Sequence, residues 1–173
     1  EVHYVTSARW EHLLGRGRHA HWHDRYCQLD DLATGKITLQ LDDHFYDVCA
    51  PLFVFTPPSV PHAFITGPDS DGHVLTVRQE LVWALAEQLW PGKAENVNRA
   101  GVCLSLADSP ATLAALAHYW PLIAAEFSAD NAGREPALAA LAQALFTLLL
   151  RAVPPEELSA CGVRGEMRQF QRF

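Results

Sequence analysis

The spacing of apolar residues changes its period near residue 78, and this change constrains the fold more than any other feature. Before it, short apolar or alternating runs at 37–41, 52–55, 62–66 and 73–77 are separated by turn-forming Gly, Pro and Asp residues. Regularly spaced short strands predict a β-sandwich or a small barrel. After it, apolar residues recur every three or four positions, which indicates helices. The sequence therefore predicts an α+β protein, with a β-barrel followed by a helical region.

Three helices are expected in the second part of the chain. The first spans Gln79–Leu89 and ends at the tripeptide 90–92, which contains Pro and Gly. The pair Ser109-Pro110 favours the start of a second helix, with Ser as the cap and Pro in the first turn. The short loop 130–133 then predicts that the second and third helices form an antiparallel hairpin. Pro121 is expected to kink or split the second helix.

Each helix of this hairpin carries an apolar seam. The seams consist of Leu113, Leu116, Trp120, Ile123 and Phe127 in one helix and of Leu138, Leu141, Leu145 and Leu148 in the other. Such a seam can pack against the barrel or against a second copy of the chain, and the spacing does not distinguish the two. We expect one seam to cover the barrel and keep a homodimer interface as the alternative for the other.

Composition and charge exclude several classes of protein. The chain is 49% hydrophobic and 19% charged, which is typical of a globular protein, and its net charge of −7 disfavours a phosphate-binding surface. No run of about 18 apolar residues and no signal peptide are found, so we expect no membrane contact. Four scattered cysteines (Cys27, Cys49, Cys103 and Cys161) indicate reduced thiols in a cytoplasmic protein rather than disulfides or a thiolate zinc site.

Histidine is concentrated at the start of the chain, where eight of the nine lie within the first 73 residues. His19, His21 and His23 alternate, so on a strand their imidazoles would project to one face. His62 is expected on a separate strand. Converging imidazoles suit zinc, iron, copper or nickel. The alternative is a stripe of solvated or hydrogen-bonded histidines, but their number favours a functional pocket.

The histidines lie in a pattern that resembles the cupin family. From Gly15 to Gly35 the spacing is that of the first cupin motif, with Gln28 where metal-binding members carry Glu. Residues 57–62 resemble the second motif, with Thr66 in place of its Asn. The resemblance implies a cupin jelly-roll barrel with its four usual ligand positions filled by His21, His23, Gln28 and His62.

The substitution of Gln for Glu bears on the metal. An amide oxygen is neutral and is a weaker ligand than a carboxylate for transition metals. Two interpretations therefore stay open. The four residues hold a divalent metal, with zinc as the first candidate, or they act as polar groups around an organic ligand and require no cofactor.

Nearly the whole chain resembles the N-terminal region of AraC-type transcriptional activators. The resembling segments are 23–29, 35–37, 57–64 and 72–77, and they are most similar to regulators of aromatic-acid catabolism that respond to 4-hydroxybenzoate or 4-hydroxyphenylacetate. The resemblance implies a cupin effector-binding barrel at 1–78, a helical dimerisation region at 79–165 and, at 166–173, the start of a connection to a helix-turn-helix DNA-binding domain outside this chain. It implies a cytoplasmic homodimer without enzymatic activity.

An aromatic acid needs contacts for its ring and a partner for its carboxylate. Phe53, Phe55 and Phe64 are candidates for the ring, although core packing is the alternative for each. His19 is the first choice for direct contact with the ligand, and Arg25 is a weaker candidate for the carboxylate. The predicted ligand-binding residues are His19, His21, His23, Gln28, Phe53, Phe55, His62 and Phe64. Two rival functions are kept: a metal-dependent cupin enzyme, such as a dioxygenase or isomerase acting on a small acid, and a barrel that senses a metal or a sugar.

Overall fold

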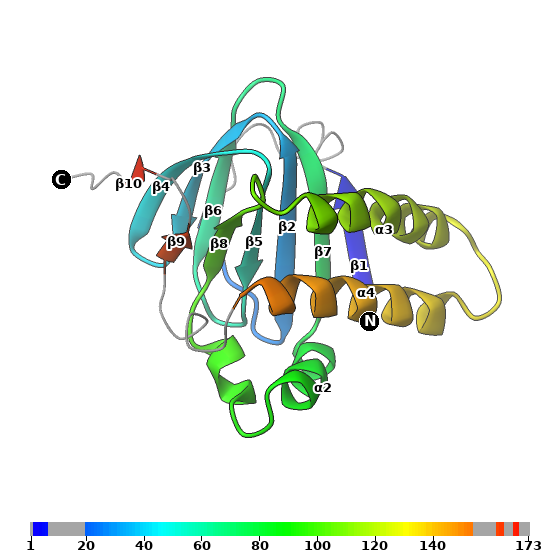
Figure 1. The fold of residues 1–173 in the computed structure, drawn as a ribbon. Helices are drawn as coiled ribbons and strands as arrows, with labels where there is room; N and C mark the ends of the chain where they lie inside the picture. Colours follow the sequence, from blue (N-terminus) through cyan, green and yellow to red (C-terminus); the bar gives the residue numbers. More distant parts are fainter. Residues whose placement is uncertain (1, 7–19, 154–161, 165–167, 170–173) are drawn as a thin grey trace.

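The computed structural model describes residues 2–6, 20–153, 162–164 and 168–169. Two β-sheets pack face to face, and helices cover the outer face of the larger sheet (Figure 1). The larger sheet has the order β1-β7-β2-β5-β8-β9, and the smaller has the order β10-β4-β3-β6. This is the expected α+β arrangement of a jelly-roll type of barrel followed by helices.

The strands are short, as the turn-rich sequence predicts. In the larger sheet they are β1 (Val2–Thr6), β7 (Asp71–Arg78), β2 (Tyr26–Thr34), β5 (Leu52–Thr56), β8 (Val102–Ser105) and β9 (Gly162–Arg164). In the smaller sheet they are β10 (Arg168–Gln169), β4 (His44–Cys49), β3 (Lys36–Leu41) and β6 (His62–Thr66). All pairs are antiparallel except β8 with β9.

The helices agree closely with the sequence pattern. Helix α2 spans Gln79–Leu89, and the hairpin consists of α3 (Pro110–Ser128) and α4 (Arg134–Ala152); a short 3₁₀ helix, η1, spans Ala94–Asn98. Helix α3 runs through Pro121 without a break, so of the kink or split expected at this residue the split does not occur. Pro121 is exposed, and water can therefore bond the carbonyl that the missing N–H leaves free.

Two separate apolar cores lie on the two sides of the larger sheet. One fills the space between the sheets, and the other lies between the larger sheet and the helices. Strand β5 is therefore buried at all five positions: Leu52 and Val54 face the smaller sheet, whereas Phe53 and Phe55 face the helices. The Phe55 ring meets Phe146 of α4 edge to face, with the ring centroids 6.2 Å apart.

Both seams of the hairpin pack toward the barrel. Leu116, Trp120 and Ile123 of α3 are buried, and so are Leu138 and Leu145 of α4. The interpretation of the seams as barrel packing is therefore confirmed for both helices. A homodimer stays a prediction.

Strand β8 lies within the stretch 79–165, where the sequence predicted a helical region. It pairs with β5, and its Val102 and Cys103 are buried in the two cores. The four-residue run 102–105 is apolar at three positions, but it was not predicted as a strand. The boundary expected between the barrel and the helical region coincides with the end of β7 at Arg78. Strands β8 and β9 follow this boundary in the sequence and complete the larger sheet.

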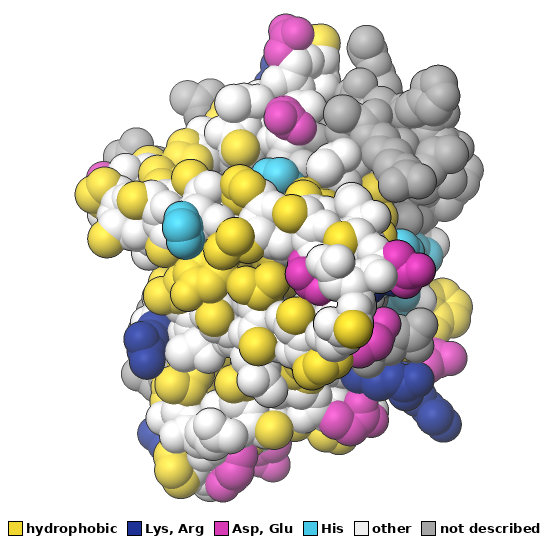
Figure 2. Space-filling view, turned by 90° about the vertical axis from the view of Figure 1, so that its right-hand side faces the viewer, with side chains coloured by type: hydrophobic (Ala, Val, Ile, Leu, Met, Phe, Trp, Pro, Cys, Tyr) yellow, Lys and Arg dark blue, Asp and Glu magenta, His cyan; other side chains and the backbone are white. Residues whose placement is uncertain are grey.

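Helix α4 bears on the expectation that the chain has no membrane-spanning helix, and it does not conflict with that expectation. Within the described part of the chain it is the one helix that is long and apolar enough to cross a bilayer, with a mean hydropathy of 1.3. Its buried residues, among them Leu145, Phe146 and Leu149, pack in the barrel–helix core instead. Figure 2 views the end of the molecule where the hairpin loop lies and shows further hydrophobic side chains at that surface.

Candidate functional site

Three histidines from two separate segments meet beside the space between the sheets. His21 and His23 lie in the stretch before β2, and His62 is the first residue of β6. One ring nitrogen of each lies within 4.8 Å of those of the others, and the His21 and His62 ring centroids are 4.4 Å apart. Trp22 is 61% exposed, so the alternation predicted from the sequence holds between residues 21 and 23. The predicted convergence with His62 is confirmed, whereas His19 lies outside the described residues.

Backbone pairing brings the two segments together. His21 and His62 form an isolated antiparallel bridge with N···O distances of 3.1 and 2.9 Å. The turn before β6 contains Ser59 in the left-handed region, with φ of 64°, and its N–H donates to the His23 carbonyl at 2.8 Å. The site therefore depends on this turn rather than on the regular strand that the sequence predicted for residues 19–23.

The tautomer of His62 follows from its backbone contact. Its Nδ1 lies 3.0 Å from the Val60 carbonyl oxygen. A carbonyl oxygen only accepts, so Nδ1 carries a proton and Nε2 is the ring nitrogen left to hold a metal ion. His62 has no exposed surface, so this nitrogen lies within the protein.

A chain of buried hydrogen bonds ties His23 to a carboxylate. The Nε2 of Gln28 donates to both carboxylate oxygens of Asp30 at 3.0 Å, which fixes the orientation of the amide. The Gln28 Oε1 then lies 3.0 Å from the His23 Nε2, which must be the donor. Gln28 is 1% exposed and Asp30 is 9% exposed. Gln28 therefore orients a histidine and links it to a negative charge, in addition to occupying a predicted ligand position.

These groups fit a divalent metal ion. Among the described residues, the His, Cys, Asp or Glu side chains that lie close enough together to share one ion are those of His21, His23 and His62. Neutral imidazoles held by hydrogen bonds to a carbonyl and a carboxylate-linked amide are usual zinc ligands with their outer partners. Such an ion would supply a positive charge and a Lewis acid at the edge of the barrel.

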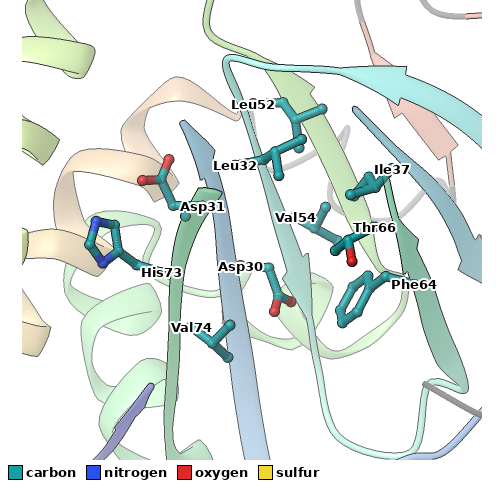
Figure 3. A pocket seen from close by; sticks show the side chains of 11 residues that line it. Asp30, Asp31, Leu32, Ile37, Leu52, Val54, Phe64, Thr66, His73 and Val74 are labelled. Carbon is teal, nitrogen blue, oxygen red and sulfur yellow. The ribbon is translucent and has the colours of Figure 1, made fainter. Parts of the chain in front are cut away.

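The space between the sheets contains a small cavity of about 40 Å³ that is open on one side. Phe64, Val54 and Asp30 point toward it from three different strands (Figure 3). This volume holds a few water molecules and is too small for an aromatic acid. Phe64 thus lies in the barrel interior as predicted, but beside a cavity without room for the expected ligand.

A larger groove connects the inner face of the larger sheet with the end of the helical hairpin. Its volume is about 490 Å³, within the range of small-molecule sites. It is lined by Val2, His3, Val5, His23, Tyr26, Gln28, Val74, Thr76, Phe127, Arg134 and Glu135. The groove therefore reaches the histidine cluster through His23 and Gln28 and reaches the hairpin through Phe127 and Arg134.

The hairpin part of the groove is held by a cation stacked on an aromatic ring. The Arg134 guanidinium carbon lies 5.1 Å from the Phe127 ring centroid, and its Nη2 donates to the Phe127 carbonyl at 2.8 Å. His3 of β1 stacks on the same ring with the centroids 5.6 Å apart. One ring therefore links β1, the end of α3 and the start of α4.

A second titratable cluster lies on the opposite side of β2, beneath α3. The Tyr4 hydroxyl is 2.8 Å from the His73 Nδ1, and the His73 ring stacks on Trp120 with the centroids 4.7 Å apart. Burial raises the pKa of Asp31 to about 6; the Trp120 indole opposes this rise and Asp71 adds to it. Burial also lowers the pKa of His73 and raises that of Tyr4, while the charge of Asp71 raises both. Figure 3 shows Asp31 and His73 on the side away from the interior residues.

The structure separates the predicted site residues into groups. His21, His23, Gln28 and His62 lie together, and Phe64 lies deeper in the same interior. Phe53 and Phe55 do not join them, because both face the helices. Arg25 is exposed.

Sequence reasoning missed Asp30, Phe127 and Arg134. The spacing of Gln28 and Asp30 by two residues was a signal for a shared face on a strand. No comparable signal existed for the two hairpin residues, because their approach to the barrel depends on tertiary packing.

Three of the four cysteines lie within the described residues. Cys27 and Cys103 are buried and free, and burial raises the pKa of each to about 12. Cys49 is free and exposed, and Cys161 lies outside the described residues.

Several solved structures align with this chain. Apo ToxT from Vibrio cholerae, in a single-residue variant, aligns over 87% of this chain and 55% of its own, with 14% identity and a TM-score of 0.51. The AraC-like transcriptional activator CuxR aligns over 79% of this chain and 43% of its own, with 14% identity and a TM-score of 0.48. A cupin protein from Bacteroides fragilis covers 45% of this chain and 63% of its own, with 16% identity and a TM-score of 0.33.

These similarities concern the fold. Structures similar to this chain thus include AraC-like regulators and cupin proteins. No protein family model matches the sequence, and no curated protein does. The chain spans about half the length of the ToxT chain that it resembles.

Proposed function

We propose that this chain is the effector-binding part of an AraC-type transcriptional activator. Its ligand in this proposal is a small aromatic carboxylic acid, with 4-hydroxybenzoate as the first candidate. The observation that carries the proposal is the groove of about 490 Å³ that barrel and hairpin line together. A binding site shared by two structural parts is what a ligand needs in order to change their relative arrangement.

The chemistry of the groove suits an amphipathic acid. Val5, Val74 and Phe127 offer apolar and aromatic surface for a flat ring. Thr76 offers a hydrogen-bonding group of the kind that a phenolic hydroxyl requires, and Arg134 offers a positive charge. This assignment moves the aromatic contacts from Phe53 and Phe55 to residues that line the groove.

The remaining parts of the proposal follow from the same interpretation. The protein acts in the cytoplasm as a homodimer, controls genes of aromatic catabolism and contacts DNA through a helix-turn-helix domain outside this chain. The fold shared with ToxT over 87% of the chain supports the arrangement of barrel and helices on which this interpretation rests. Residues 1–78 and 79–165 are then the effector-binding and dimerisation regions, with β8 contributed to the barrel by the second.

The histidine cluster is proposed to hold zinc when metal is present. His21, His23 and His62 are the ligands, and the Gln28–Asp30 pair orients His23. The ion is not required by the proposal, since the groove contains a cationic side chain of its own.

A calorimetric titration tests the proposal. Wild-type protein is titrated with 4-hydroxybenzoate as purified and after chelator treatment, and the double variant His21→Ala/His62→Ala is titrated in parallel. Saturable binding in both wild-type samples supports an acid sensor that needs no metal. Binding that the chelator and the double variant both abolish makes the metal part of the recognition site. Absence of heat in every sample contradicts the aromatic-acid assignment.

The second candidate function is a metal-dependent cupin enzyme acting on a small acid. The three imidazoles around one point favour it, since this is a usual set of ligands for a catalytic metal. Incubating iron- or zinc-loaded protein with 4-hydroxybenzoate and following the acid by chromatography distinguishes the two. Turnover supports the enzyme, and recovery of unchanged ligand supports the regulator.

A further inference from the structure

We infer that Arg134 is the anion anchor of the groove and that the carboxylate of the bound acid is held by its guanidinium group. This inference rests on the proposed function and adds to it the position of the acid group. It assigns the charged end of the ligand to the helical hairpin rather than to the histidine cluster, where the sequence placed it.

The hydrogen bonds of Arg134 leave part of its guanidinium group available. Its Nη2 donates to the Phe127 carbonyl, and this contact holds the group in place. Among the described residues its Nε is buried and has no hydrogen-bond partner. Buried donors in folded proteins are nearly always paired, and the Arg134 side chain also lines the groove, so an acceptor from outside the chain that enters the groove would meet an unpaired guanidinium donor. A carboxylate oxygen is the strongest acceptor for this donor.

The charges around the groove favour a monoanion. Arg134 is the one permanently charged cation among the described lining residues, in a chain whose net charge is −7. Glu135 also lines the groove, but it is exposed, so water screens its charge. Phe127 beneath the guanidinium is placed to contact the apolar body of the same ligand. The ligand class is therefore a monocarboxylate attached to an apolar ring or chain.

The position of Arg134 gives the anchor a regulatory consequence. It is the first residue of α4 and follows the hairpin loop 130–133 directly. A ligand held by Arg134 and by β1, β2 and β7 ties the start of α4 to the barrel. Binding then reduces opening of the loop, and a helix terminus is where such local opening is easiest.

Four proteins test the anchor: the wild type, Arg134→Gln, Arg134→Lys and the matched control Arg151→Gln, which removes an exposed arginine from the other end of α4. Each is titrated with 4-hydroxybenzoate and with the neutral analogue 4-hydroxybenzamide. Arg134→Gln is expected to bind the acid about 10- to 100-fold more weakly, which is the usual effect of losing a hydrogen bond between charged groups. Amide binding and the Arg151→Gln protein are expected to stay unchanged, and Arg134→Lys to retain part of the acid affinity.

Amide hydrogen exchange gives the second readout. The acid is expected to slow exchange in residues 129–137 of the wild type, and this protection is lost in Arg134→Gln. If Arg134→Gln binds the acid as tightly as the wild type does, the anchor is refuted while the proposed function stands. If the wild type binds neither compound, both are refuted. A thermal melt of each variant confirms that it is folded, and Arg134→Lys keeps the test decisive if Arg134→Gln unfolds.

Discussion

Replacement of Asp31 by Asn is expected to stabilise the protein at neutral pH. Asp31 is 7% exposed and lies beneath Trp120 of α3, where burial raises its pKa to about 6 from an ordinary value of 3.8. The unfolded chain therefore releases this proton at a lower pH than the folded chain does. As pH rises from about 4 to about 6, the ionisation of Asp31 therefore lowers the free energy of unfolding by about 3 kcal/mol, compared with a protein in which this group does not titrate.

The expected difference between the two proteins follows directly. Below pH 4 the carboxyl is protonated in both states, and Asn, of nearly the same shape, should leave the free energy of unfolding almost unchanged. Above pH 6 the variant should be the more stable by up to about 3 kcal/mol. An effect of that size would raise the melting temperature by several degrees for a chain of this length.

Urea unfolding at pH values from 4 to 8, followed by tryptophan fluorescence, measures this difference. Asp43→Asn is the matched control, because it removes the same charge from an exposed turn. The variant and wild-type curves of stability against pH should diverge between pH 4 and 6 for Asp31→Asn only. Parallel curves for Asp31→Asn and the wild type would refute the reasoning that burial dominates at this carboxyl.

Three further predictions concern the barrel and its thiols. Gln28→Leu breaks the hydrogen bonds that link His23 to Asp30. The zinc affinity, measured by competition with a chromogenic chelator, should therefore fall about 10- to 100-fold. An unchanged zinc affinity would show that these hydrogen bonds do not orient His23. Gly72→Ala places a Cβ 1.9 Å from the Asp31 carbonyl oxygen and should lower the free energy of unfolding by more than about 3 kcal/mol. The control Gly92→Ala places a Cβ where nothing lies within 4 Å and should cost only about 1 kcal/mol, because of the positive φ of this residue. Similar melting temperatures for the two variants would contradict this. Alkylation followed by peptide mapping should label Cys49 in the native protein, and Cys27 and Cys103 only after unfolding. The reason is that a pKa of about 12 leaves almost no thiolate at Cys27 and Cys103. Equal labelling rates at all three cysteines would contradict the burial of Cys27 and Cys103.

The elements with a strong local pattern were predictable from the sequence. Helix α2 has the predicted bounds, because a helical period, a Pro and a Gly all act within a few residues of its end. The meeting of His21, His23 and His62 was predictable from alternation together with the cupin-like spacing. The side chains of His21 and His23 still alternate with that of Trp22, although residues 20–25 do not form a regular strand. A single bridge to His62 is enough to hold the backbone extended here.

What depends on long-range packing was not predictable. The sequence of β5 is apolar at consecutive positions because both faces of the strand are covered, and period alone then cannot tell which face Phe53 or Phe55 takes. The groove requires β1 and α4 to approach each other across more than a hundred residues, so Arg134 carried no local signal. The hydrogen bond from Gln28 to Asp30 depends on side-chain geometry within the barrel, which spacing suggests but does not determine.

The most direct test of the central claim is a map of where the acid binds. Uniformly ¹⁵N-labelled protein is titrated with 4-hydroxybenzoate, and amide chemical shifts are followed residue by residue. The account predicts that the largest changes fall on residues of the groove, from Tyr26 and Thr76 on the barrel to Phe127 and Arg134 on the hairpin. Largest changes on β3 and β4 of the smaller sheet, with the groove residues unaffected, would contradict it.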